Sequence, residues 1–276
     1  MTNRLPALPI VACCLVFLAE CCSASNSRPP ATPDRRLFPD ASGSLPDGQV
    51  LSTETVLDLN DLKTNPTPYA WFDFKPNVKK LILAGAPETQ HVAILWYTIA
   101  EGGVGLHYHS KTESVYVIDG TQTDAKGVYP TGTVYFNPPG SGHKITHSTG
   151  FFVLAYASPP DFKNTTLIGE YTPVRIDTGA PDLTSLYPVK ESKSGVRIFP
   201  VPLVDAGGMS AAFVEITSSA DYVYVGNYLL VVKGSCEIQG ATFAKDWLVV
   251  GRTVKPRPYK IAASKHSSCL AMGVSF

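Results

Sequence analysis

From residue 50 onward, the chain is a succession of short runs of β-branched and aromatic residues separated by Gly, Pro, Asn and Asp. The residues of the runs favour strands, and the residues between them favour turns. No window of helical length has a convincing apolar period of 3.6 residues. The sequence therefore predicts an all-β sandwich or barrel. The expected strands include residues 69–74, 80–83, 91–99, 114–118, 133–136 and 151–156.

The segment 102–147 holds the residues that suit a transition-metal site. His107 and His109 are separated by one residue, Tyr108. Because alternate side chains of a strand lie on one face, both imidazoles can point to the same side. They are the first two predicted ligands.

The other two predicted ligands follow at the ends of expected strands. Glu113 begins the next apolar run, which ends at a turn signal, Asp119-Gly120. His143 follows a turn rich in Pro and Gly at residues 138–142. Three imidazoles and one carboxylate suit a divalent transition metal, with Fe(II) expected for an enzyme and Zn, Mn or Ni as alternatives. The spacing thus predicts one ion bound by all four side chains.

These spacings resemble the two cupin motifs. The first motif corresponds to Gly102, His107, His109, Glu113 and Gly120, and the second to Gly132, Pro138, Gly140 and His143, with His147 where the motif has Asn. More narrowly, residues 120–150 are similar to the ChrR-like cupins. That subgroup contains the sensor half of anti-sigma factors and is related to acetylacetone and dihydroxyacetophenone dioxygenases. The resemblance covers roughly residues 90–160 and implies a jelly-roll barrel, which we expect at residues 49–160.

A second half of the chain repeats the pattern of the first. The runs at 209–217, 227–234 and 242–261 echo those at 91–99, 113–120 and 128–145. We expect a connector at 161–195 and a second, degenerate cupin domain at 196–276. Registering the halves on their glycines places Asp221, Val223, Asn227 and Tyr259 at the ligand positions. The second domain is therefore expected to bind no metal.

The N-terminal residues resemble an export signal. An apolar run at 5–19 is too short to span a bilayer comfortably, so we expect a cleaved signal peptide at 1–24 and no transmembrane span after cleavage. Residues 25–48 are rich in Pro, Ser, Asp and Arg, which predicts a disordered tether. We therefore expect the protein to be secreted or periplasmic. Cys21 ends an imperfect lipobox, which leaves a lipoprotein as an alternative.

Charge and cysteine content limit the partners. The chain has 23 basic and 23 acidic residues and no basic patch, so nothing predicts nucleic-acid binding. Cys236 and Cys269 are the two cysteines beyond the signal. They form either a disulfide, as exported proteins allow, or two buried thiols. A small-molecule ligand is the expected partner, and a homodimer is compatible with this interpretation.

We interpret the chain as an exported, metal-dependent enzyme, dioxygenase-like or lyase-like, that acts on a small oxygenated substrate such as a diketone or hydroxyketone. Trp96 or Tyr97, Tyr116 and Tyr135 are candidates for the pocket wall or for core packing. His147 shares a face with His143 if the strand stays extended, and it is then a candidate catalytic proton carrier. The alternative is an exposed His147 and a non-catalytic metal-binding or ligand-binding cupin.

Overall fold

A computed structural model describes residues 54–193, 195–203, 207–217, 220–264 and 267–276 of the chain. The expected signal peptide and tether lie outside these residues. The paired strands of the described part are all antiparallel, which confirms the all-β prediction. No helix in this part is long and apolar enough to cross a bilayer.

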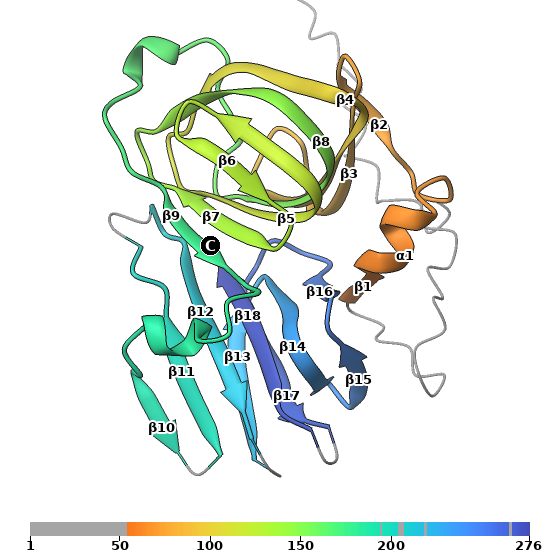
Figure 1. Cartoon of the computed structure of the whole chain (residues 1–276), viewed down its shortest axis with the longest axis vertical. Coiled ribbons are helices and arrows are strands. Elements are labelled where there is room, and N and C mark those ends of the chain that lie inside the picture. The colour runs from red at the N-terminus through yellow and green to blue at the C-terminus, as the bar shows by residue number, and fades with distance from the viewer. Residues whose placement is uncertain (1–53, 194, 204–206, 218–219, 265–266) are drawn as a thin grey trace, which may run out of the picture. The chain divides into compact units, whose positions relative to one another are not determined.

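The first sheet has eight strands in the order β2-β3-β4-β8-β5-β7-β9, with β6 paired to β5. Figure 1 shows β3 to β8 curving around a common interior. The strands are β2 (Phe72–Lys75), β3 (Val78–Gly85), β4 (His91–Tyr108), β5 (Glu113–Asp124), β6 (Gly127–Pro130), β7 (Thr133–Asn137), β8 (Gly142–Tyr156) and β9 (Val174–Asp177).

The second sheet has ten strands, of which seven follow the order β1-β16-β14-β18-β12-β11-β10 and three pair off this path. They are β1 (Glu54–Asp58), β10 (Glu191–Lys193), β11 (Val196–Pro200), β12 (Ser210–Ile216), β13 (Asp221–Gly226), β14 (Tyr228–Ile238), β15 (Ala241–Ala244), β16 (Trp247–Gly251), β17 (Arg257–Ala263) and β18 (Cys269–Ser275). The repeat seen in the sequence is thus a second β-barrel.

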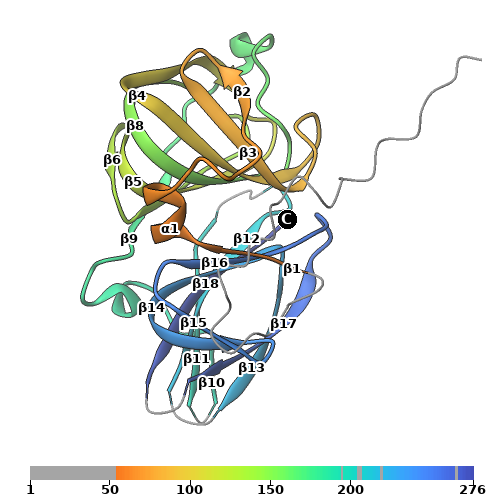
Figure 2. The ribbon, with the colours of Figure 1, turned by 90° about the vertical axis from the view of Figure 1, so that its right-hand side faces the viewer.

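Strand β1 crosses the domain boundary that the sequence predicted. It was expected in the first barrel, within residues 49–160, but it pairs with β16 of the second sheet along its whole length. In Figure 2, β1 lies beside β16 among the strands of the C-terminal half. Conversely, β9 of the expected connector pairs with β7 of the first sheet. Sequence order alone could not show this exchange, because both pairings join distant segments.

The two faces of the sheets form separate cores. Val115 and Val117 of β5 point into the first barrel, where they pack with residues such as Tyr97 and Leu154. The alternate residue Tyr116 joins a second apolar cluster that also contains residues of β14, β16 and β18. A third cluster fills the second barrel. Because alternate residues of a strand point to opposite faces, one set of side chains points into the first barrel, where a binding site can form, and the other set packs outside it.

Short local signals account for two differences from the predicted elements. A helix, α1 (Leu59–Thr64), follows β1 because the Asp58 side chain accepts hydrogen bonds from the amides of Asn60 and Asp61. Six residues are too few for a helical period to show in the sequence. The connector also contains the short 3-10 helices Thr165–Leu167 and Leu183–Leu186, which the sequence did not predict.

The expected turn at Asp119-Gly120 is instead a bulge within β5. The strand continues to Asp124, and its register with β8 shifts between Val117 and Asp119. Gly120 has a φ of +80°, a conformation that favours glycine. It lies opposite Gly150, whose φ is +93°. The turn residues therefore bend a long strand and do not end it.

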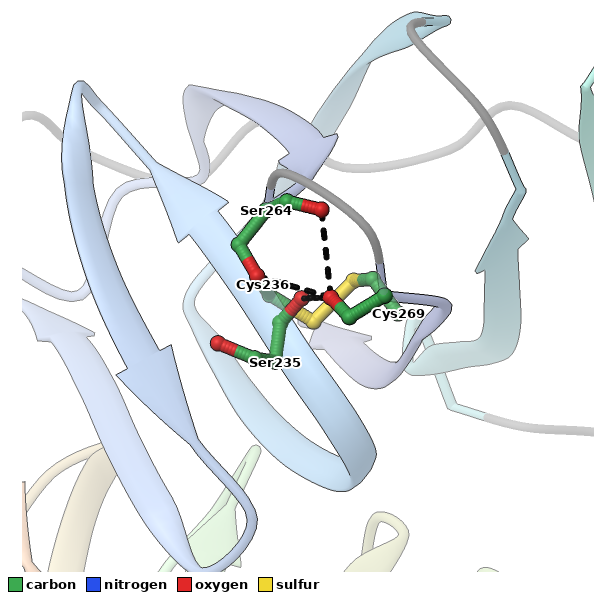
Figure 3. The surroundings of a disulfide bond; sticks show 5 residues. Ser235, Cys236, Ser264 and Cys269 are labelled. Carbon is green, nitrogen blue, oxygen red and sulfur yellow. Dashed lines mark hydrogen bonds between the residues drawn. A yellow bond between two sulfur atoms is a disulfide. The ribbon is translucent and has the colours of Figure 1, made fainter.

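The two cysteines of the described residues form a disulfide within the second barrel. Cys236 of β14 and Cys269 of β18 are both fully buried and bonded, with their Cα atoms 4.9 Å apart. Figure 3 shows the bond beside Ser235 and Ser264. The sequence left a disulfide and two free thiols open, and the structure contains the disulfide.

Candidate metal centre

Four predicted ligands converge inside the first barrel. His107, His109, Glu113 and His143 are all buried, and one donor atom from each lies within 4.8 Å of the others. His107 lies near the end of β4, His109 directly follows that strand, Glu113 begins β5, and His143 is the second residue of β8. Residues as far apart in the sequence as His109 and His143, which are separated by 34 positions, thus meet at one point.

Backbone pairing explains the convergence. His107 lies directly opposite His143 in the β4–β8 ladder. The turn before β8 is hydrogen-bonded to His109, whose amide donates to the carbonyl of Ser141 and whose carbonyl accepts from the amide of Gly140. Gly140 has a φ of +83°, so this turn requires glycine. The Pro and Gly residues of the motif therefore aim the His143 imidazole.

The spacing of the donor atoms fits a transition-metal ion. His109 Nε2 lies 3.3 Å from His143 Nε2, and Glu113 Oε2 lies 3.3 Å from each of these nitrogens. Atoms that bind one ion at about 2.0 to 2.2 Å are separated by about 3 Å or slightly more. Lone pairs this close repel each other unless a proton or a cation lies between them. The donor set therefore fits a divalent ion.

Hydrogen bonds on the far side of two imidazoles turn their Nε2 atoms toward the centre. His107 Nδ1 lies 2.8 Å from the carbonyl oxygen of Gly105, which can only accept, so Nδ1 carries the proton. His143 Nδ1 lies 2.8 Å from Asp124 Oδ2. A carboxylate in this position orients a metal-binding histidine and increases its basicity. Sequence reasoning missed Asp124, because no local spacing links it to His143.

Glu113 is held in place by two further side chains that the sequence did not reveal. The amide of Asn137 donates a 2.8 Å hydrogen bond to Oε2, across the β5–β7 pairing. The hydroxyl of Tyr156 also hydrogen-bonds to this carboxylate, and its ring stacks on His109 at 6.0 Å. Both contacts come from strands far away in the sequence. They fix the carboxylate orientation before any ion binds.

Burial and mutual charge control protonation at the centre. Burial lowers the pKa of His107 to about 3 and that of His109 to about 4, so both imidazoles are neutral near pH 7. Burial also opposes the charge on His143, but its hydrogen bonds to Asp124 and Glu113 outweigh this and raise its pKa to about 9. The imidazoles keep the pKa of Glu113 below its usual range in spite of burial. A bound cation must therefore displace one proton, from His143.

A small pocket is lined by three of the four candidate ligands, His107, Glu113 and His143. Its walls are apolar at Leu95, Val104 and Leu154, and its polar lining includes Gln122. Gln122 is buried, and its Oε1 has no hydrogen-bond partner among the described residues. The space open to the centre of a water molecule is about 10 Å³, room for about one water. This pocket is the place where a ligand would reach the ion.

The aromatic residues considered for the pocket wall divide between pocket and core. Tyr97 lines the pocket. Tyr135 lies in the barrel core outside the pocket lining, whereas Tyr116 and Trp96 belong to the cluster on the outer face of the sheet. Strand parity separates them, because Trp96 and Tyr97 are neighbours on one strand.

His147 does not reach the centre. The prediction required an extended chain from Lys144 to His147, but His147 has a φ of +47° and its side chain is exposed. The register between β4 and β8 shifts at this place, with Ile145 opposite Val104 and Ser148 opposite Gly102. This irregularity turns the imidazole outward. The structure therefore contradicts the interpretation of His147 as a residue that lines the pocket.

The second barrel has a different interior at the corresponding place. Asp221 and Val223 are exposed, and Asp221 pairs with Lys260 on the surface. Tyr259 is buried and donates a hydrogen bond to the carbonyl of Asn227. Among the residues that the structure describes, only the first barrel contains a metal-binding group. The predicted register therefore put two surface residues, Asp221 and Val223, at ligand positions.

Residues 60–158 match the sequence model of the ChrR cupin-like domain. This segment is a ChrR-like cupin domain. It contains all four candidate ligands and Asp124. A search of curated proteins found no match to the chain.

Solved structures similar to the chain cover most of its length. A candidate dioxygenase from Nostoc punctiforme is 10% identical in sequence, with a TM-score of 0.51 over 82% of this chain and 84% of that protein. Variants of oxalate decarboxylase from Bacillus subtilis are 10% and 11% identical, with TM-scores of 0.45 over 83% of this chain and 78% of theirs. At 10% identity the first similarity shows the two-barrel fold alone and nothing about the reaction.

Proposed function

We propose that this chain is a metal-dependent enzyme of the cupin type, dioxygenase-like or lyase-like, that acts on a small oxygenated substrate such as a diketone or hydroxyketone. The observation that carries the proposal is the convergence of four buried donor atoms beside a pocket lined by apolar walls. His107, His109, Glu113 and His143 would hold the ion. When bound, a divalent ion supplies a Lewis acid that polarises a substrate oxygen.

The side chains of this domain would bind and orient the substrate. Asp124 holds the His143 ring, and Asn137 holds Glu113, so that the ligand set is rigid before substrate arrives. The free Oε1 of Gln122 provides a polar contact for a substrate hydroxyl. Leu95 and Val104 exclude water, which strengthens electrostatic interactions in the pocket. These roles suit a ligand with adjacent oxygen atoms and a short carbon skeleton.

A second function is a non-catalytic metal-binding or ligand-binding cupin. One observation favours it, namely the small free volume of the pocket beside the donor atoms. Four protein ligands around a tetrahedral zinc ion close the coordination sphere and leave no place for substrate. The same four side chains around an ion that prefers six ligands leave open positions. Metal identity therefore separates the two functions.

Metal analysis of protein purified without added ions tests the proposal. We expect stoichiometric Fe(II), Mn or Ni and consumption of O₂ or cleavage of substrate with a panel of β-diketones and hydroxyketones. Glu113→Gln should lose both metal and turnover, whereas the exposed His147→Gln should keep both. Tightly bound four-coordinate zinc without turnover would establish the non-catalytic function instead.

We also propose that the chain is exported, as a secreted or periplasmic protein. The apolar N-terminal run and the buried disulfide support this, because structural disulfides persist in oxidising compartments. Sequencing the N-terminus of the mature protein from fractionated cells should reveal cleavage after Ala24. A lipid-modified Cys21 would establish anchoring, and an intact Met1 in the cytoplasm would refute export.

A further inference from the structure

A buried lysine lies behind the wall of the metal pocket. Lys80 is 1% exposed and lies on β3, on the same face as Val78, which belongs to the core of the first barrel. Its Nζ lies 4.7 Å from the ring centre of Phe74 and 5.0 Å from that of Tyr156. Both rings line the pocket. An ammonium group thus lies one aromatic ring away from the ligand space.

The contacts of His91 show that Lys80 is the charged member of the pair. His91 is fully buried, and its Nδ1 lies 2.7 Å from the carbonyl oxygen of Thr89, which can only accept. Nδ1 therefore carries the proton, and Nε2 accepts a 2.7 Å hydrogen bond from the Lys80 ammonium. Burial and the neighbouring Lys80 lower the pKa of His91 to about 4, so the imidazole is neutral.

No carboxylate of the described residues is in direct contact with Lys80. Among the described residues, no ion pair involves Lys80, and its partners are a neutral imidazole and two aromatic faces. Burial lowers its pKa to about 8, opposed by the charges of Glu113 and Glu88. The ammonium is therefore still protonated near pH 7. A buried charge without a counter-charge at contact is costly unless the site supplies one.

The buried charges of the first barrel do not balance when a divalent ion is bound. The buried acidic and basic side chains of this sheet are Lys80, Glu113 and Asp124. Two carboxylates offset the two charges of a divalent ion held by neutral histidines. The positive charge of the Lys80 ammonium is then not compensated, so the site with bound ion has an excess of one positive charge. A ligand with one negative charge would neutralise it.

We propose that Lys80, held by His91, makes the metal pocket selective for ligands with one negative charge, such as a carboxylate or an enolate. Lys80 acts across Phe74 and Tyr156 through its charge and does not bind the ion. The inference rests on the metal site of the proposed function and narrows its substrate class. It also gives a function to the buried Lys80–His91 pair, which does not take part in metal binding.

Two equilibrium measurements on the cobalt(II)-loaded protein test this role without turnover. The first is the affinity for cobalt(II) against a chromophoric chelator, and the second is binding of acetate or its neutral isostere acetamide, followed through the cobalt absorption spectrum. In Lys80→Met, loss of a nearby positive charge should weaken acetate binding about tenfold and tighten cobalt binding several-fold. Acetamide binding should not change. Lys80→Gln, which can still donate to His91, should behave in the same way.

Lys79→Met is the matched control. Lys79 is the neighbouring residue, it is partly exposed, and it pairs with Asp73 at 2.9 Å. Its removal changes the net charge equally but should leave both affinities unchanged, because solvent screens it. Opposite changes in metal and acetate affinity identify a charge effect, since damage to packing would weaken both. Parallel weakening, or acetate binding as in wild type, would overturn the proposal. Failure to bind cobalt at all would refute the metal site itself.

Discussion

At the scale of single residues, His143 connects the metal centre to the rest of the barrel. Its Nε2 faces Glu113, and its Nδ1 is held by Asp124 at the end of β5. The same ring is protonated without metal and must be neutral with it. Side chains that the motif does not include therefore control how strongly the motif residues bind an ion.

Asp124→Asn should weaken metal binding by about 10- to 100-fold, because the amide no longer orients the ring as a charged acceptor. A competition titration with zinc or cobalt(II) measures this change. The control is Asp119→Asn, on the exposed face of the same strand. Equal affinities for wild type and Asp124→Asn would show that Asp124 does not support the ligand set.

The metal-free protein should be most stable near pH 6.5. Below that pH, histidines of the unfolded chain bind protons, whereas folded His107 and His109, with pKa values of about 3 and 4, stay neutral. The unfolded state is therefore favoured, and stability falls as the pH falls. Above it, unfolded histidine loses its proton while folded His143, with a pKa of about 9, keeps it, so stability falls again until about pH 8, where folded Lys80, with a pKa of about 8, begins to lose its own proton and opposes the trend. Urea unfolding in chelator between pH 4 and 10 measures both limbs. Saturating metal should remove the fall in stability above pH 6.5, and stability that keeps rising to pH 8 in chelator would contradict the protonation of His143.

At the scale of elements, the long strands of the first barrel depend on glycine bulges. The Gly120–Gly150 pair lets β5 and β8 continue past the point where the sheet bends. A Cβ atom on Gly120 would overlap the carbonyl of Thr149, which is backbone and cannot move aside. The bulge thus positions the far end of β5, where Asp124 lies.

Gly120→Ala should lower the free energy of unfolding by at least about 1 to 3 kcal/mol, because it adds a backbone clash to an unfavourable φ. Gly105→Ala is the control, since a Cβ there meets nothing within 4 Å and φ is not in the left-handed region. Urea unfolding of both variants provides the comparison. If Gly120→Ala and Gly105→Ala lower the free energy of unfolding equally, the bulge at Gly120 does not explain the loss of stability.

At the scale of the whole described structure, β1 joins the second sheet although it precedes the first sheet in sequence. Leu57 of β1 is buried in the cluster that includes residues of both sheets. A hydrogen bond between Ser114 and Tyr228 links the two sheets, and one between Tyr116 and Asp246 links the first sheet to the turn before β16. The N-terminal strand is therefore part of the core of the C-terminal half.

Leu57→Ala should cost about 2 to 5 kcal/mol of stability, the usual cost of a cavity at a buried leucine. Thr55→Ala, at a half-buried position of the same strand, should change it by only about 0.5 kcal/mol. Urea unfolding followed by tryptophan fluorescence measures both. A small effect of Leu57→Ala would show that β1 is not integral to this core.

Much of the fold and the ligand set could be predicted because the signals are local. The alternation of His107 and His109, the strand start at Glu113 and the Pro and Gly turn before His143 each depend on a few adjacent residues. The same local rules failed at His147, where a bulge reversed the expected face. They also failed at Gly120, because a turn pair and a bulge have the same composition.

The sequence by itself determined the all-β fold, the repeat and the four side chains suited to an ion, since these depend on periodicity and short spacing. Only the tertiary structure decided that β1 belongs to the second sheet, that Cys236 bonds to Cys269 and that Asp124 and Lys80 lie around the centre. These contacts join strands that are distant along the chain. Which residues meet in these contacts depends on how each barrel closes, and no short stretch of the sequence encodes the closure.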